Sequence, residues 1–188
     1  MTHIYHRIFD EFRILDAEDI SRADDFAGSA RWLDAPGCLF QANNFVLDGG
    51  LRTEGAVKAG LFVTIVLKGA GHGGPRLGAK RFRYSENSIV VMALREPAAC
   101  GGEAPDGTHM SAASLAFPKA SIERLGLQRE FLGLFARNGG DAFVATLKAP
   151  PRPAGYLDSP DVTRRFTYIM LKLHTDMFAG CPESCFWA

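Results

Sequence analysis

The sequence lacks a charge of one sign, a long hydrophobic run and an apolar segment behind its N-terminus. Its 188 residues include 21 basic and 21 acidic side chains, whereas a domain that holds nucleic-acid phosphates usually carries a basic excess. No apolar run approaches the roughly 18 residues that a membrane span needs, and no signal peptide is visible at the first residues. We therefore expect a soluble, cytoplasmic domain with no membrane partner and no DNA-binding surface of its own.

Cysteine and histidine are few and scattered, at four and five residues. Cys181 and Cys185 lack the two-residue spacing of a zinc knuckle, and no two histidines have the H-x-H or H-E-x-x-H spacing of metal ligands. The nucleophile motif G-x-S-x-G is absent as well. The sequence predicts no catalytic residue, no metal ion and no other cofactor, which favours a binding protein over an enzyme.

Short apolar segments with turns between them fill the middle of the chain. Extended segments are predicted at 38–47, 61–67, 80–84, 89–94 and 109–117, and Gly-containing turns at 36–37, 48–50, 68–78 and 100–107. A continuous apolar run such as 61–67 suits a strand that is buried on both faces. This rhythm indicates an antiparallel sandwich or barrel over residues 35–117.

One predicted turn, Gly69 to Gly74, matches the dinucleotide-binding pattern G-x-G-x-x-G. That pattern binds a pyrophosphate only where its glycines open a helix. Pro75 and Gly78 do not suit a helix at this point, so we expect a plain hairpin loop between two strands.

Helical spacing replaces strand spacing after Pro118. A short helix is predicted from Pro118 to the residue before Gly126, and a second one carries an i, i+3, i+4 apolar stripe within 131–135. Ser159 is expected to begin a long helix, from about 160 to 177, after a stiff Pro-rich linker. Residues 118–180 are thus expected to form a helical segment, followed by a tail at 181–188.

Residues 1–34 are expected to form an N-terminal arm with a short helix from Asp16 to about residue 26, which Gly28 would end. This segment carries four basic and eight acidic side chains, whereas the block 35–96 carries eight basic and four acidic ones. We predict that acidic side chains of the arm lie near the arginines of 76–83 and orient the arm, with Phe9 and Phe12 as apolar anchors.

Three segments carry a resemblance to a known family: LFVTIVLKG at 61–69, RFRYSENSIVVM at 81–92 and SLAFPKASIERLG at 114–126. With the order of elements over about residues 35–178, they make the chain resemble the N-terminal cupin-like sensor domain of AraC-type transcriptional regulators. The resemblance implies a mainly β fold, namely a cupin-like double-stranded β-helix (a jelly-roll barrel) followed by a helical segment. It also implies a domain that senses a small-molecule effector and forms a homodimer.

The chain departs from that family and from cupin enzymes in two ways. It has no cluster of histidines and a carboxylate on adjacent strands, which argues for a sensor over a cupin-superfamily isomerase or oxygenase, the alternative reading. No segment after Met177 suits a recognition helix, so DNA contact is expected only through a missing or separate helix-turn-helix domain. Whether the chain is a truncated regulator or a stand-alone protein is left open.

The candidate ligand-binding residues come from three predicted strands. Phe62 and Thr64 share one face of the strand at 61–67, and the sequence leaves open which face of that strand lines the barrel. Arg81 and Arg83 share a face and would suit an anionic ligand if buried, although a solvated basic strand is the simpler reading. His109 is a candidate donor to a ligand, with a histidine that faces water as the alternative.

The candidate dimerisation residues lie on the long helix and comprise Val162, Phe166, Ile169, Met170 and Leu173. They form an apolar stripe that must be buried against another surface. That surface is either the wall of the protein's own barrel or the same helix of a second subunit, packed antiparallel about a two-fold axis.

Overall fold

The computed structural model describes residues 9–14, 26–47, 51–75, 82–104, 108–150 and 161–179. The strands within these ranges are β1 (Phe9–Ile14), β2 (Phe26–Ala35), β3 (Cys38–Leu47), β4 (Leu51–Val57), β5 (Gly60–Lys68), β6 (Ala70–Pro75), β7 (Phe82–Ser85), β8 (Ser88–Leu94), β9 (Ala98–Ala104), β10 (Thr108–Pro118) and β11 (Ala142–Lys148). The helices are α3 (Lys119–Arg124), α4 (Gln128–Asn138) and α5 (Val162–Phe178).

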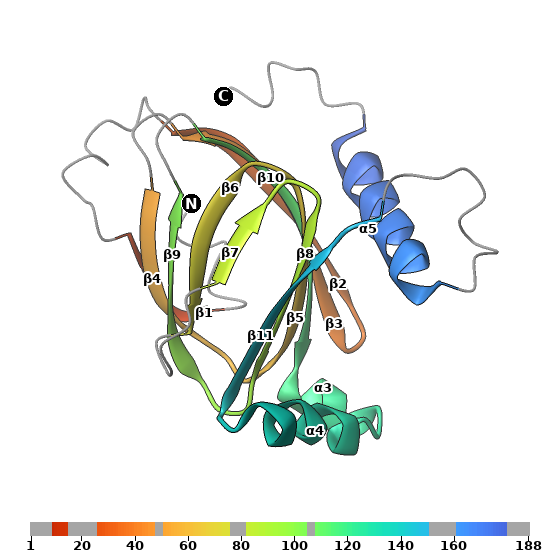
Figure 1. Ribbon diagram of the computed structural model, residues 1–188. Coiled ribbons are helices and arrows are strands. Elements are labelled where there is room, and N and C mark those ends of the chain that lie inside the picture. Colours follow the sequence, from red (N-terminus) through yellow and green to blue (C-terminus); the bar gives the residue numbers. More distant parts are fainter. Residues whose placement is uncertain are drawn as a thin grey trace.

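The strands form two sheets that curve around a shared interior (Figure 1). One sheet has the order β1-β4-β9-β6-β7 and the other the order β11-β8-β5-β10-β3-β2, and the neighbouring strands run antiparallel. α5 lies outside the six-stranded sheet, and α3 and α4 lie at one end of the barrel (Figure 1). This is the mainly β jelly-roll architecture that the sequence predicts, so the predicted fold class is confirmed.

The contacts of β5 show which face of that strand lines the barrel. Ile65 belongs to the buried cluster beneath α5, together with Met170 and Phe178, and Val63 packs against the same cluster. Phe62 instead packs against a different cluster, which includes Val57 and Cys100 of the other sheet. Because side chains alternate along a strand, Phe62, Thr64 and Val66 face the interior and Val63, Ile65 and Leu67 face α5.

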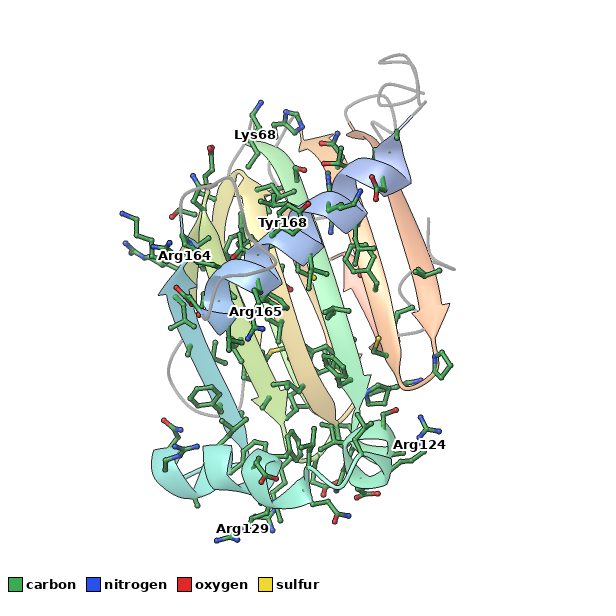
Figure 2. All side chains as sticks on the ribbon, turned by 90° about the vertical axis from the view of Figure 1, so that its right-hand side faces the viewer. Lys68, Arg124, Arg129, Arg164, Arg165 and Tyr168 are labelled. Atoms are coloured by element: carbon green, nitrogen blue, oxygen red, sulfur yellow. The ribbon has the colours of Figure 1, made fainter. Side chains whose placement is uncertain are left out.

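α5 packs across the outer face of the six-stranded sheet (Figure 2). Its sheet-facing side includes Met170, which is fully buried, and the partly buried Phe166 and Leu173. Val162 and Ile169 are 68% and 45% exposed. The predicted apolar stripe therefore divides, because three of its five residues pack on the protein's own barrel and two face outward.

The start of α5 differs slightly from the predicted start of the long helix. The residue that caps α5 is Asp161, whose Oδ1 accepts hydrogen bonds from the backbone N–H groups of Thr163 and Arg164 at 2.9 and 3.4 Å. The prediction of Ser159 falls on a residue outside the described ranges. An aspartate and a serine are comparably good caps, so spacing alone did not distinguish them.

Several barrel strands lie where the sequence predicted turns or helices. β6 and β9 occupy the Gly-rich stretches at 68–78 and 100–107, and β11 lies within the predicted helical segment. The glycines of β6 reflect close packing of strands: a Cβ at Gly71 would lie 2.6 Å from the Glu103 carbonyl oxygen, and one at Gly73 would lie 2.7 Å from the Gly101 carbonyl oxygen. Glycine here marks a close approach of backbones and not a loop.

The N-terminal segment also contains strands. Gly28 lies inside β2, which pairs with β3 over its whole length, so it does not end a helix, and residues 15–25 lie outside the described ranges. β1 pairs with β4 at one edge of the five-stranded sheet, and β7 forms the other edge. Glu11 and Arg83 thus lie on strands at opposite edges of this sheet, and the predicted approach of the arm to the arginines stays a prediction. The remaining partners of that prediction, and the side chains of Phe9 and Phe12, lie outside the described part of the chain.

Candidate functional site

The register of four neighbouring strands brings polar residues into one row inside the barrel. Gln41 of β3 pairs with Ser114 of β10, and Ser114 pairs with Thr64 of β5. Thr64 pairs with Val90 of β8, and the Thr64 and Ser114 hydroxyl oxygens are hydrogen-bonded at 2.8 Å. Gln41 is only 7% exposed. Hydroxyl and amide groups thus occupy the middle of the interior face.

Asn43 extends this row by one step along β3. It pairs with Ala112, which pairs with Val66 of the interior face. The Asn43 Oδ1 atom is buried and has no hydrogen-bond partner among the described residues. A buried carbonyl oxygen without a donor costs about 1–3 kcal/mol, so Asn43 is the part of the row that would gain most from a ligand donor. We call Gln41, Asn43, Thr64 and Ser114 the interior polar set.

An apolar cluster lies at one end of the same interior. It consists of Val57, Leu94, Ala98 and Cys100, with Phe62, Met92 and Ala142 packed against it. Burial raises the pKa of the Cys100 thiol to about 12, so this side chain stays uncharged and acts as a small apolar residue. Of the predicted ligand-binding residues, Phe62 and Thr64 lie together on this interior face.

His109 lies on the opposite face of the six-stranded sheet. It is two residues from Ser111, whose hydroxyl contacts His174 of α5 at 3.2 Å, and residues two apart on a strand share a face. The His109 Nε2 atom is 2.6 Å from the Asn44 Oδ1 atom. Burial and the positive charge of Lys68 lower the pKa of His109. The structure therefore separates His109 from Phe62 and Thr64.

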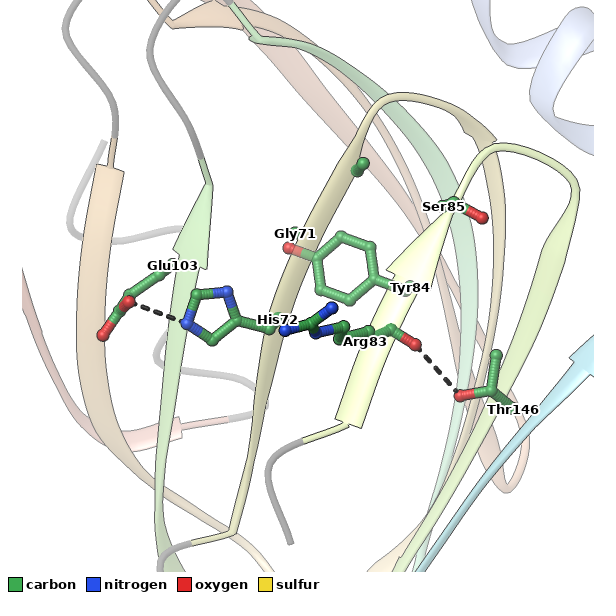
Figure 3. Close-up of a pocket in the computed structure, with 8 residues that line it drawn as sticks. Gly71, His72, Arg83, Tyr84, Ser85, Glu103 and Thr146 are labelled. Atoms are coloured by element: carbon green, nitrogen blue, oxygen red, sulfur yellow. Dashed lines mark hydrogen bonds and ion pairs between the residues drawn. The ribbon is translucent and has the colours of Figure 1, made fainter.

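Arg83 lies on β7, on the outer face of the five-stranded sheet, and is exposed. A cavity of about 620 Å³ opens beside it, with the His72 and Glu103 side chains on its wall (Figure 3). The His72 Nε2 atom is 2.7 Å from Glu103 Oε2, and His72 is the register partner of both Arg83 and Glu103. Arg81, the other predicted arginine, lies outside the described ranges.

The His72–Glu103 pair was not predicted from the sequence. The two residues are 31 positions apart, and they meet only because β6 and β9 are neighbouring strands. Both strands lie in stretches whose glycines predicted turns, so no local pattern pointed to the pairing.

The described ranges contain no group of three or more His, Cys, Asp or Glu residues that could hold a metal ion. None of the described helices combines the length and the apolar composition that crossing a membrane requires.

Solved structures of similar fold identify the architecture. The AraC-like transcriptional activator CuxR matches 96% of this chain with a TM-score of 0.53 and 13% sequence identity, and the match spans 63% of the CuxR chain. The cupin domain of Schizosaccharomyces pombe Cnp3 matches 61% of this chain and 75% of its own, with a TM-score of 0.38 and 11% identity. A salicylate 1,2-dioxygenase from Pseudoaminobacter salicylatoxidans matches 65% of this chain and 29% of its own, with a TM-score of 0.39 and 14% identity.

No protein-family model and no curated protein matches the sequence. The chain spans less than two thirds of the AraC-like activator. The predicted resemblance to the cupin-like domain of AraC-type regulators is confirmed at the level of the fold. At 13% identity and a TM-score of 0.53, the match to the AraC-like activator shows a shared fold.

Proposed function

We propose that this chain is a regulatory cupin domain of AraC type that binds a small-molecule effector inside its barrel. The observation that carries the proposal is the interior polar set, in which the buried Asn43 Oδ1 atom has no partner among the described residues. The shared fold with an AraC-like activator over 96% of the chain supports the regulatory role.

The chemistry of the interior polar set favours an uncharged effector. Amide and hydroxyl groups both donate and accept hydrogen bonds, whereas an ionised ligand buried among them would have no opposite charge to offset its desolvation. Asn43 calls for a donor on the effector, such as a hydroxyl or an N–H group. The apolar cluster around Phe62 suits a hydrocarbon part of the same molecule.

A thermal-shift experiment with a panel of neutral sugars, polyols and amides tests this site. A compound that binds there, added at a free concentration of about 100 times its Kd, should raise the Tm of the wild-type protein by about 5–10 °C. The gain should be lost in Asn43→Leu and Thr64→Val, and kept in Thr175→Val, a variant of an exposed threonine on α5. Stabilisation that both interior variants retain would overturn the proposal, and so would a panel without any binder.

Metal analysis of the purified protein separates this proposal from the cupin-enzyme reading. Stoichiometric iron, manganese, nickel or zinc would favour an isomerase or oxygenase. A protein without stoichiometric metal that responds to the panel supports the sensor.

The proposal includes self-association through α5 in the cytoplasm, with DNA contact supplied by a helix-turn-helix domain outside these elements. The exposed side chains of Val162 and Ile169 support it, because they are the outward part of an otherwise buried stripe. Ile169→Asp tests the homodimer more cleanly than Phe166→Asp, since Phe166 packs on the protein's own sheet. Light scattering should show a dimer for the wild type and a monomer for Ile169→Asp. A wild-type monomer at tens of micromolar (roughly the range of weak dimers) would refute this part.

A further inference from the structure

α3 and α4 enclose an apolar groove of about 480 Å³ at the end of the barrel. Its floor includes Ile122 and Phe131, which are 4% and 6% exposed and belong to one buried cluster with Phe135. The turn at Gly126, with a φ of +71°, separates the two helices. We call this feature the α3–α4 groove.

The edge of the groove is lined with leucines that face solvent. Leu125 and Leu127 line it and are 57% and 48% exposed, and Leu132 on α4 is 48% exposed. Leu125 and Leu127, two residues apart and both lining the groove, form an apolar patch at its edge, unlike isolated surface apolar residues. Such a patch beside a formed groove marks an interaction surface.

The charges at the groove indicate what binds there. Arg129 and Arg137 line it together with Glu130, so the lining carries two basic side chains and one acidic one. The Arg129 side chain has no partner among the described residues, and Figure 2 shows Arg124 and Arg129 projecting away from the barrel. A second copy of the same surface would oppose like charges, which disfavours self-association here.

We propose that the α3–α4 groove binds an amphipathic helix of a partner protein, with apolar anchors flanked by aspartate or glutamate residues. The anchors would cover the exposed leucines and continue the buried cluster, as helices do in apolar grooves. The acidic flanks would meet Arg129 and Arg137 at the rim. This surface is separate from the barrel interior, so the inference goes beyond the proposed function.

The probe for this inference is a synthetic helical peptide with leucines at i, i+3, i+4 and i+7 and glutamates at the flanking positions. Fluorescence anisotropy would measure its binding to the full chain, beside the same peptide with lysine flanks and one with scrambled leucines. The glutamate peptide should bind at least about tenfold more tightly than either control peptide, and its advantage over the lysine peptide should shrink in high salt.

Two variants place the binding at the groove. Leu127 is the N-cap of α4, where serine is a preferred residue, so Leu127→Ser removes the apolar side chain without weakening the helix. It should reduce binding of the glutamate peptide about tenfold, and Arg129→Glu should favour the lysine peptide instead. Leu147→Ser is the matched control, because Leu147 on β11 is 49% exposed and lies outside the groove.

Several outcomes would overturn the inference. These are equal binding of the acidic and basic peptides, binding that Leu127→Ser leaves unchanged, and loss of affinity in Leu147→Ser of the same size. Self-association that Leu127→Ser abolishes would assign the groove to a second copy of the chain. None of these results bears on the effector site, since no panel compound is present.

Discussion

Replacing Met170 by alanine tests how α5 is held. Met170 is fully buried between α5 and the six-stranded sheet, in a cluster with Ile65, Ile89 and Ala113. Truncation of a buried methionine to alanine costs about 2–5 kcal/mol, against a total stability of about 5–15 kcal/mol for a typical domain. At about 2–4 °C per kcal/mol for a chain of this length, the Tm should fall by about 4–20 °C. Thermal unfolding followed by circular dichroism measures this fall.

The neighbouring Ile169 supplies the control on the same helix. It is 45% exposed, so Ile169→Ala should shift the free energy of unfolding by less than about 1 kcal/mol in the monomer. A Tm for Met170→Ala within about 2 °C of the wild type would refute the packing of α5 on the sheet. If Ile169→Ala is equally costly, and the cost rises with protein concentration, a second subunit buries this side of the helix.

Three further predictions concern single groups. Burial lowers the pKa of His174 in the folded protein. The neutral imidazole therefore contributes stability above about pH 6.5, and this stability is lost as the pH falls toward the lower pKa of the folded state. In His174→Gln, the fall in Tm between about pH 7.5 and about pH 5.5 should be smaller than in the wild type. Gly71→Ala should lower the free energy of unfolding in urea by about 1–3 kcal/mol, because its Cβ would meet the Tyr84 hydroxyl and the Glu103 carbonyl oxygen. Gly133→Ala should instead raise the free energy of unfolding by about 0.5–1 kcal/mol. Gly133 lies in the middle of α4, and the nearest atom to its added Cβ would be a side-chain atom of Arg137 at 3.9 Å. Because burial raises the pKa of Cys100 to about 12, mass spectrometry after iodoacetamide treatment of the folded protein should find Cys38 modified and Cys100 intact.

Each of these has a clear contradicting result. A pH dependence that His174→Gln leaves unchanged would place the titration elsewhere, with His109 as the next group to replace. Equal effects of the two glycine variants would contradict the close approach at Gly71. Labelling of Cys100 at the rate of Cys38 would show that the interior is open to solvent.

The apolar strands and the helices were predictable because their signals are local. Apart from Thr64, the run at 61–67 is apolar on both sides. One face meets the barrel interior and the other packs against α5 and, at Leu61, against the cluster of α3 and α4, and these contacts select apolar residues. The start and end of α4 follow from an apolar stripe and from Gly139, whose φ of +69° closes the helix. The structure of such elements follows from patterns within their own sequence.

The Gly-rich strands were not predictable because their signal is ambiguous. Glycine marks turns through its backbone freedom, and it also marks places where two backbones approach closely. At Gly71 and Gly73 the second cause applies, and only the positions of β9 and Tyr84 reveal it. β11 was missed for a related reason, because its seven residues are partly exposed and pair with a strand far away in the sequence.

Only the part of the candidate site that lies on one strand was predictable, because the remaining residues come from strands far away in the sequence. Period-two alternation grouped Phe62 with Thr64, but the polar partners of Thr64 come from β3 and β10, which lie 20 to 50 residues away in the sequence. The buried oxygen of Asn43 has no sequence signal, since an exposed asparagine would look the same. The contacts of Asn43 also span the sheet: its side chain belongs to the interior row, while its backbone oxygen lies 3.3 Å from the His174 Nε2 atom of α5. The barrel interior and the outer helix are therefore separated by the backbone of one strand, and a ligand that engages Asn43 acts on a residue that α5 already contacts.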